Sequence, residues 1–131
     1  MEILASRVLL RPRNLDASLT FYEGVLGLHR FREFGRPPSR GVVFFLGGGY
    51  LELTETAPGA PPDPPAGVRL WLQVRNVAAS VAAIRVAGMP IEHAPEHKPW
   101  GLIEAVVHDP DGLPLVLVEV PPDHPLRRDT R

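Results

Sequence analysis

Histidines, carboxylates and arginines are the side chains of this chain that could do chemistry, because the sequence contains no cysteine. Disulfides, thiolate nucleophiles and cysteine-based metal sites are therefore excluded. No serine lies in the glycine-flanked strand-to-helix turn that presents a nucleophile. The three glycines Gly47 to Gly49 resemble a phosphate-binding loop in composition alone, since no helix follows them, and they predict a hairpin turn.

Three histidines could in principle act as metal ligands or proton carriers. His93 and His97 are four residues apart, but Pro95 is incompatible with a helix between them. In an extended chain this separation is about 13 Å, too far for one metal ion. We expect both to be solvent or loop histidines. His108, beside Asp109 at a strand end, has two open roles, a proton carrier and a turn hydrogen bond.

Several charged and aromatic side chains alternate with apolar ones, which places them on one face of the predicted strands. Glu104 shares a face with Val106 and His108 on a later strand. On the other predicted strands, the residues that share such a face are Arg7, Leu9 and Arg11, then Tyr50, Glu52 and Thr54, and then Arg69, Trp71 and Gln73.

A repeat explains how these strands are positioned. RVLLRPRNLDAS, from Arg7 to Ser18, returns as RLWLQVRNVAAS, from Arg69 to Ser80. Two copies with so long a period indicate two fused modules. In each copy the strand-like alternation changes to helical spacing at an asparagine, Asn14 or Asn76, whose side chain can cap a helix.

Each module is predicted to have the order βαβββ. The first has strands at residues 3–11, 28–34, 42–46 and 50–55 and a helix from Asn14 to Gly27. The second has strands at 68–74, 90–93, 102–108 and 115–120, a helix from Asn76 to Gly88, and a loop from residue 94 to Trp100. We expect one domain, residues 1–120, made of modules 1–56 and 67–120. A proline-rich extended linker, 57–66, joins them, and a loose tail, 121–131, follows.

Composition excludes several classes of partner. The net charge of −1 gives no electrostatic reason to expect nucleic acid or a membrane surface. The sequence has no apolar run of about 18 residues and no signal-peptide core, so a cytoplasmic location is expected.

The tandem modules carry two motifs, Leu15-x-x-Ser18-x-x-Phe21-Tyr22-x-x-Val25-Leu26-Gly27 and Asp109-Pro110-Asp111-Gly112. With these motifs the chain resembles the vicinal oxygen chelate superfamily of glyoxalases, bleomycin-resistance proteins and extradiol dioxygenases. Lys98-Pro99-Trp100-Gly101 is most similar to the bleomycin-resistance-like members. The resemblance covers about residues 3–120 and implies an α+β fold, in which helices lie outside curved mixed sheets that together enclose a cup.

Metal-dependent members of the superfamily place ligands at positions that match Arg7, Glu52, Arg69 and Val116. Only Glu52 can bind a metal, because a protonated guanidinium has no lone pair to offer. One carboxylate cannot supply the three protein ligands of a typical catalytic site. The resemblance therefore implies that the metal site is lost, and no cofactor is expected. The arginines are expected to pair with Glu52 and with Glu104.

The resulting expectation is a metal-free protein that binds a small, partly aromatic or anionic molecule in the cup. The predicted ligand-binding residues are Arg7, Leu9, Arg11, Tyr50, Glu52, Arg69, Trp71, Gln73, Trp100, Glu104 and Val116. Trp100 has two open roles, covering the cup and acting as a packing anchor. The alternatives to binding are an enzyme, namely a lyase, isomerase or dioxygenase that uses a metal or Glu52 or Glu104 as base, and a purely structural role for the arginines. A homodimer is expected, since open sheets leave edges to cover.

Overall fold

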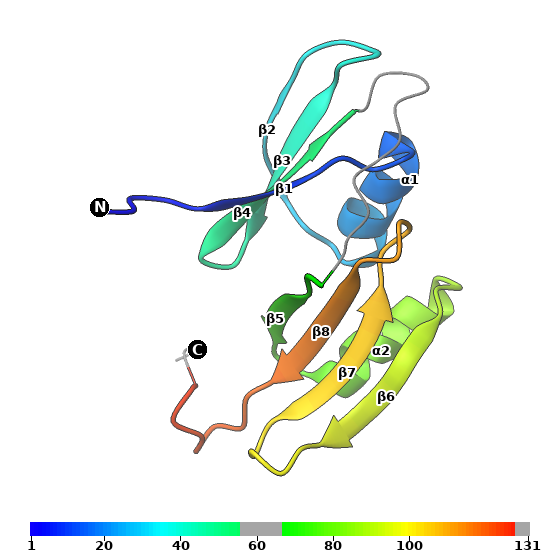
Figure 1. Ribbon diagram of the computed structural model, residues 1–131. Coiled ribbons are helices and arrows are strands. Elements are labelled where there is room, and N and C mark those ends of the chain that lie inside the picture. Colours follow the sequence, from blue (N-terminus) through cyan, green and yellow to red (C-terminus); the bar gives the residue numbers. More distant parts are fainter. Residues whose placement is uncertain (56–66, 128–131) are drawn as a thin grey trace. The chain divides into compact units, whose positions relative to one another are not determined.

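The computed structural model describes residues 1–55 and 67–127 (Figure 1). The chain divides into two compact units, Met1–Pro65 and Ala66–Arg131, referred to as unit 1 and unit 2. The predicted linker at 57–66 lies outside the described residues, as do residue 56 and the last four residues of the tail.

Both units have the predicted order of elements. Unit 1 contains β1 (Arg7–Leu10), α1 (Leu15–Leu19), the π-helix η1 (Thr20–Val25), β2 (Arg30–Phe34), β3 (Gly41–Leu46) and β4 (Gly49–Thr54). Unit 2 contains β5 (Leu70–Val74), α2 (Val77–Val86), β6 (Ile91–His97), β7 (Ile103–His108) and β8 (Pro114–Glu119).

The two four-stranded sheets have the same topology. Their strand orders are β1-β4-β3-β2 and β5-β8-β7-β6. In each sheet the first strand pairs in parallel with the last, and the remaining pairs are antiparallel. The α+β class with two βαβββ modules is confirmed, and the sequence repeat corresponds to β1–α1 and β5–α2.

The repeated asparagine caps a helix in both units, as predicted. The Asn14 side chain accepts a hydrogen bond from the Ala17 backbone N–H at 3.0 Å, and Asn76 accepts one from Ala79 at 2.8 Å. Both caps have extended backbones, which start the helix immediately after the strand. Glu119, at the end of β8, adds a carboxylate that accepts from the Val77 N–H at 2.9 Å.

Three details of the predicted elements are wrong. The first helix is not a single α-helix, because its second half is η1, where the Leu26 N–H bonds the Phe21 carbonyl. Strand β1 is shorter than residues 3–11. Strand β6 continues to His97 where a loop was predicted, so His93 and His97 are strand residues. Proline is tolerated in β6 because this strand is at the edge of its sheet.

Each sheet buries one face against its own helix. In unit 2, α2 packs on β6, β7 and β8 (Figure 1). The buried large hydrophobic residues of unit 1 are Leu15, Phe21, Tyr22, Val42, Val43, Phe44, Leu51 and Leu53, of which all but Val43 lie on the helix side. Alternation leaves the opposite face of each sheet without a helix. We call it the open face.

Candidate functional site

The open face of unit 1 carries an ion pair between β1 and β4. Parallel pairing sets Arg7 opposite Tyr50 and Leu9 opposite Glu52. Arg7 Nη1 lies 2.8 Å from Glu52 Oε1, and the guanidinium carbon is 5.7 Å from the centre of the Tyr50 ring. The other carboxylate oxygen of Glu52 accepts from the Thr54 hydroxyl at 3.3 Å. The expected pairing of Arg7 with Glu52 is therefore present.

An exposed aromatic cluster lies beside this ion pair. The Phe31 ring centre is 5.1 Å from that of Phe45 and 5.0 Å from that of Tyr50, and Phe45 and Tyr50 are 5.9 Å apart. The exposed fraction is 45% for Phe31 and 47% for Phe45. Three mutually touching aromatic rings therefore remain accessible on a face that has no helix.

Phe31 and Phe45 were not predicted as site residues. Phe45 could have been found, because the hairpin over Gly47 and Gly48 sets it opposite Tyr50. Phe31 gave no such signal. A register shift between Arg30 and Arg32 brings its ring to this face, and a bulge of this kind is invisible to strict alternation.

Two further predicted residues of unit 1 lie on β1 or just beyond its end. Leu9 is exposed to 65%, and Arg11 is exposed just beyond the end of β1. Arg32 pairs with Val43 across the sheet, and its guanidinium carbon is 5.3 Å from the centre of the Phe34 ring. The aromatic surface is therefore bordered by cationic side chains.

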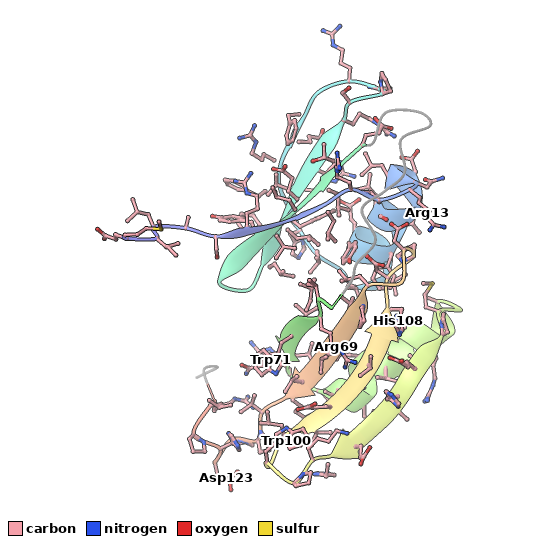
Figure 2. All side chains as sticks on the ribbon, in the orientation of Figure 1. Arg13, Arg69, Trp71, Trp100, His108 and Asp123 are labelled. Atoms are coloured by element: carbon pink, nitrogen blue, oxygen red, sulfur yellow. The ribbon has the colours of Figure 1, made fainter. Side chains whose placement is uncertain are left out.

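The open face of unit 2 carries Trp71, Gln73 and Val116. Trp71 pairs with Val116, which pairs in turn with Val106 on β7. Trp71 is exposed to 51%, while Gln73 and Val116 are half-buried. Figure 2 shows Trp71 beside β5, with Arg69 at the start of that strand.

Glu104 and Trp100 contact each other directly. The Trp100 indole N–H donates to Glu104 Oε2 at 2.7 Å, and Lys98 Nζ lies 6.0 Å from the indole ring centre. The predicted pairing of an arginine with Glu104 is wrong within unit 2, where this carboxylate is bonded to the indole. The hydrogen bond from His108 lowers the pKa of the Glu92 carboxyl, and the charge of Arg69 makes a smaller contribution in the same direction.

His108 forms hydrogen bonds through both ring nitrogens. Nδ1 lies 3.0 Å from the Gly112 carbonyl oxygen, and Nε2 lies 2.8 Å from Glu92 Oε2. Both neighbours are acceptors, so only the imidazolium can donate to both. The carbonyl of Gly112 and the carboxylate of Glu92 raise the pKa of His108, and His108 lowers the pKa of Glu92. Of the two predicted roles, the turn hydrogen bond is present.

This arrangement predicts a pH-dependent contribution to stability. The His108 contribution should be fully present below its unfolded pKa of about 6.5 and lost as pH rises through the higher folded value. Between pH 6 and pH 9, the melting temperature of the wild type should fall by more than that of His108→Gln. The difference should be small, because solvent screens the pair. Parallel pH curves for the two proteins would contradict this assignment.

The donor set at the four family positions does not fit a catalytic metal. Glu52 alone has a donor atom, and its carboxylate is bonded to Arg7 and Thr54. Arg7 and Arg69 would repel a cation. Within residues 1–55 and 67–127, no group of three or more histidine, aspartate or glutamate side chains is arranged to hold a metal ion.

Residues 5–117 match the family described as the Glyoxalase/Bleomycin resistance protein/Dioxygenase superfamily. The match covers most of the chain, and the chain belongs to this superfamily. No curated protein matches its sequence significantly. Across the described residues, no helix is long and apolar enough to cross a membrane.

Solved structures share the fold. The chain is 28% identical to SMU.1112c, with a TM-score of 0.76, covering 91% of this chain and 99% of that one. It is 21% identical to TnmS3, an antibiotic binding protein from Streptomyces sp. CB03234, with a TM-score of 0.73 and coverage of 92% and 98%. It is also 21% identical to glyoxalase I from Zea mays, with a TM-score of 0.76, covering 86% of this chain and 43% of that one.

Proposed function

We propose that this protein is a metal-free small-molecule-binding protein that takes a partly aromatic or anionic ligand on its open sheet faces. The observation that carries the proposal is the exposed cluster of Phe31, Phe45 and Tyr50 beside the Arg7–Glu52 pair. Aromatic rings gain from stacking as well as from burial, so such a cluster favours a planar partner. The fold shared with the antibiotic binding protein TnmS3 is consistent with this role.

Charge on the same face favours an anionic group on the ligand. Only one of the two terminal nitrogens of the Arg7 guanidinium is bonded to Glu52, so the other nitrogen can donate to a ligand oxygen. Arg32, which is opposite Val43 on this face, adds a second positive charge. A small aromatic acid therefore meets both requirements of this surface.

The proposed ligand-binding residues comprise the predicted set and two additions. In unit 1 they are Arg7, Leu9, Arg11, Tyr50 and Glu52, with Phe31 and Phe45 added. In unit 2 they are Arg69, Trp71, Gln73, Trp100, Glu104 and Val116.

The alternative enzyme would use Glu52 or Glu104 as a general base. Each of these carboxylates already accepts a hydrogen bond from a strong donor, the guanidinium of Arg7 or the indole of Trp100. The oxygens that accept these hydrogen bonds are less available to a substrate, which favours the binding role.

The proposal predicts a protein that carries no stoichiometric metal and is stabilised by aromatic acids or antibiotics. Elemental analysis of the purified chain should find no Ni, Fe, Mn, Zn or Co at a one-to-one ratio. In a thermal-shift screen, a bound compound at 100 times its Kd should stabilise the fold by about 2.7 kcal/mol. A stoichiometric metal would favour the enzyme.

Arg69→Ala separates a binding role for this arginine from a structural one. If Arg69 binds ligand, the variant should melt like the wild type but lose part of the ligand-induced shift. His29→Ala, an exposed change in unit 1, is the control. A variant that unfolds would favour the structural role, and a folded variant with an unchanged shift would exclude Arg69 from the site.

A further inference from the structure

The segment from Pro121 to Arg127 is folded onto the turn that carries Trp100. His124 Nε2 lies 3.1 Å from the Trp100 carbonyl oxygen, and the Leu126 N–H donates to His124 Nδ1 at 3.1 Å. Because Nδ1 accepts this hydrogen bond, the ring proton is on Nε2, which donates to Trp100. The imidazole therefore bridges the tail backbone and the tryptophan turn.

The rest of the segment is held by its own hydrogen bonds. The His124 N–H bonds the Pro121 carbonyl, and the Arg127 N–H bonds the His124 carbonyl, each at 3.0 Å. The Arg127 guanidinium donates to the Val120 carbonyl at the end of the sheet. The described part of the predicted loose tail is thus two consecutive turns (Figure 2, near Asp123).

The turn beneath His124 is shaped to receive the imidazole. Gly101 has φ +90°, and a Cβ on it would lie 3.1 Å from His124 Cδ2 and 3.4 Å from Nε2. A glycine is therefore needed both for the backbone conformation and for the close approach of the ring. The Gly101 N–H also bonds the Lys98 carbonyl at 2.9 Å, which closes the turn.

Apolar burial supports the same contact. Val118 lies on the open face, because it is opposite Glu104 in the sheet, yet it is fully buried. It forms a buried cluster with Leu102 and Val120, the residues that adjoin the tryptophan turn and the tail. The tryptophan turn and the tail therefore both adjoin this buried cluster.

We infer that residues 121–127 are a latch, and that His124 is a positioning residue that holds Trp100 in place for ligand binding. Trp100 is fixed at two points, its carbonyl by His124 and its indole N–H by Glu104. Trp100 nevertheless remains 57% exposed, as an anchor for a ligand must be. An aromatic side chain that is already ordered loses less conformational entropy when a ligand binds. This inference rests on the proposed function, in which Trp100 contacts the ligand.

The test uses tryptophan emission in full-length chains that carry Trp71→Phe, which leaves Trp100 as the one tryptophan. His124→Ala should increase acrylamide quenching of Trp100 and lower its fluorescence anisotropy. It should also weaken binding of the aromatic anion 1-anilinonaphthalene-8-sulfonate by about 2- to 12-fold. His124→Gln, whose amide N–H can reach the same carbonyl, should restore all three values, and His29→Ala should change none of them.

The outcomes separate the latch from the proposed function. Unchanged quenching and anisotropy in His124→Ala would overturn the latch, whatever the dye does. If His124→Ala increases the quenching of Trp100 and lowers its anisotropy but leaves the dye affinity unchanged, the positioning role would be overturned. A wild-type protein that fails to bind the dye would count against the proposed function, while the emission measurements would still decide whether the tail holds Trp100. Circular dichroism of each variant checks that it is folded.

Discussion

Phe44→Ala should destabilise unit 1 by about 3–5 kcal/mol, the usual cost of removing a buried phenylalanine. Phe44 has no exposed surface and lies on the helix side of β3, opposite Leu51. The alanine would leave a cavity in a small core that has few ways to close around it. Urea denaturation followed by far-ultraviolet circular dichroism would measure the loss in the free energy of unfolding.

Phe45→Ala is the matched control, because the adjacent residue points to the open face. Its ring is 47% exposed and touches Phe31 and Tyr50, so the variant should stay folded with a much smaller loss of stability. It should instead bind 1-anilinonaphthalene-8-sulfonate up to about tenfold more weakly, from the lost ring contacts. Equal destabilisation by the two variants, or unchanged dye affinity in Phe45→Ala, would contradict the division of β3 into a core side and a ligand side.

Gly35→Ala should have the second large effect, because two costs fall on the same residue. Gly35 has φ +76°, and a Cβ there would lie 2.2 Å from the Ser39 backbone oxygen. The left-handed conformation costs an alanine about 1–2 kcal/mol. The collision adds a cost in the range of overpacking, about 1–3 kcal/mol, because a backbone atom has to move. That backbone is tethered nearby, since Arg40 donates to Glu55 through its backbone and its guanidinium.

Gly47→Ala separates the two costs. Gly47 also has a positive φ, +54°, but no atom lies within 4 Å of its added Cβ. This variant should therefore lose the conformational part alone, about 1–2 kcal/mol. Chemical denaturation of both variants gives the comparison, and a loss for Gly47→Ala as large as that for Gly35→Ala would show that the contact with Ser39 relaxes freely.

Most of the fold could be predicted because its signals are local. The capping asparagines Asn14 and Asn76 mark both strand-to-helix junctions, and the glycine and aspartate turns mark the hairpins. The errors come from features that depend on neighbours. Strand β6 can continue through Pro95 because it is the outermost strand, and the edge that faces away from β7 pairs with no strand of its sheet. The π-helix η1 differs from an α-helix in its hydrogen bonding and not in its apolar spacing.

The candidate site was predictable where the alternation of side chains along a strand decides which face of the sheet a residue occupies. Parity and parallel pairing bring Arg7 to Glu52, as expected. The alternation of side chains along a strand cannot choose among several partners within reach, so it did not reveal that Glu104 bonds Trp100 or that Glu92 bonds His108. Nor could it reveal Phe31, which reaches the open face through a bulge, or the tail, whose polar sequence has no apolar period.

The irregular outer strands β2 and β6 have a consequence for how this protein behaves at high concentration. Both lie at the rim of their sheets, β2 with one register shift and β6 with two and a proline. A foreign strand that attempted to extend either sheet would meet interrupted rows of donors and acceptors. Templated fibrillar growth from these rims is therefore disfavoured, even though the open faces display aromatic rings that would otherwise promote it.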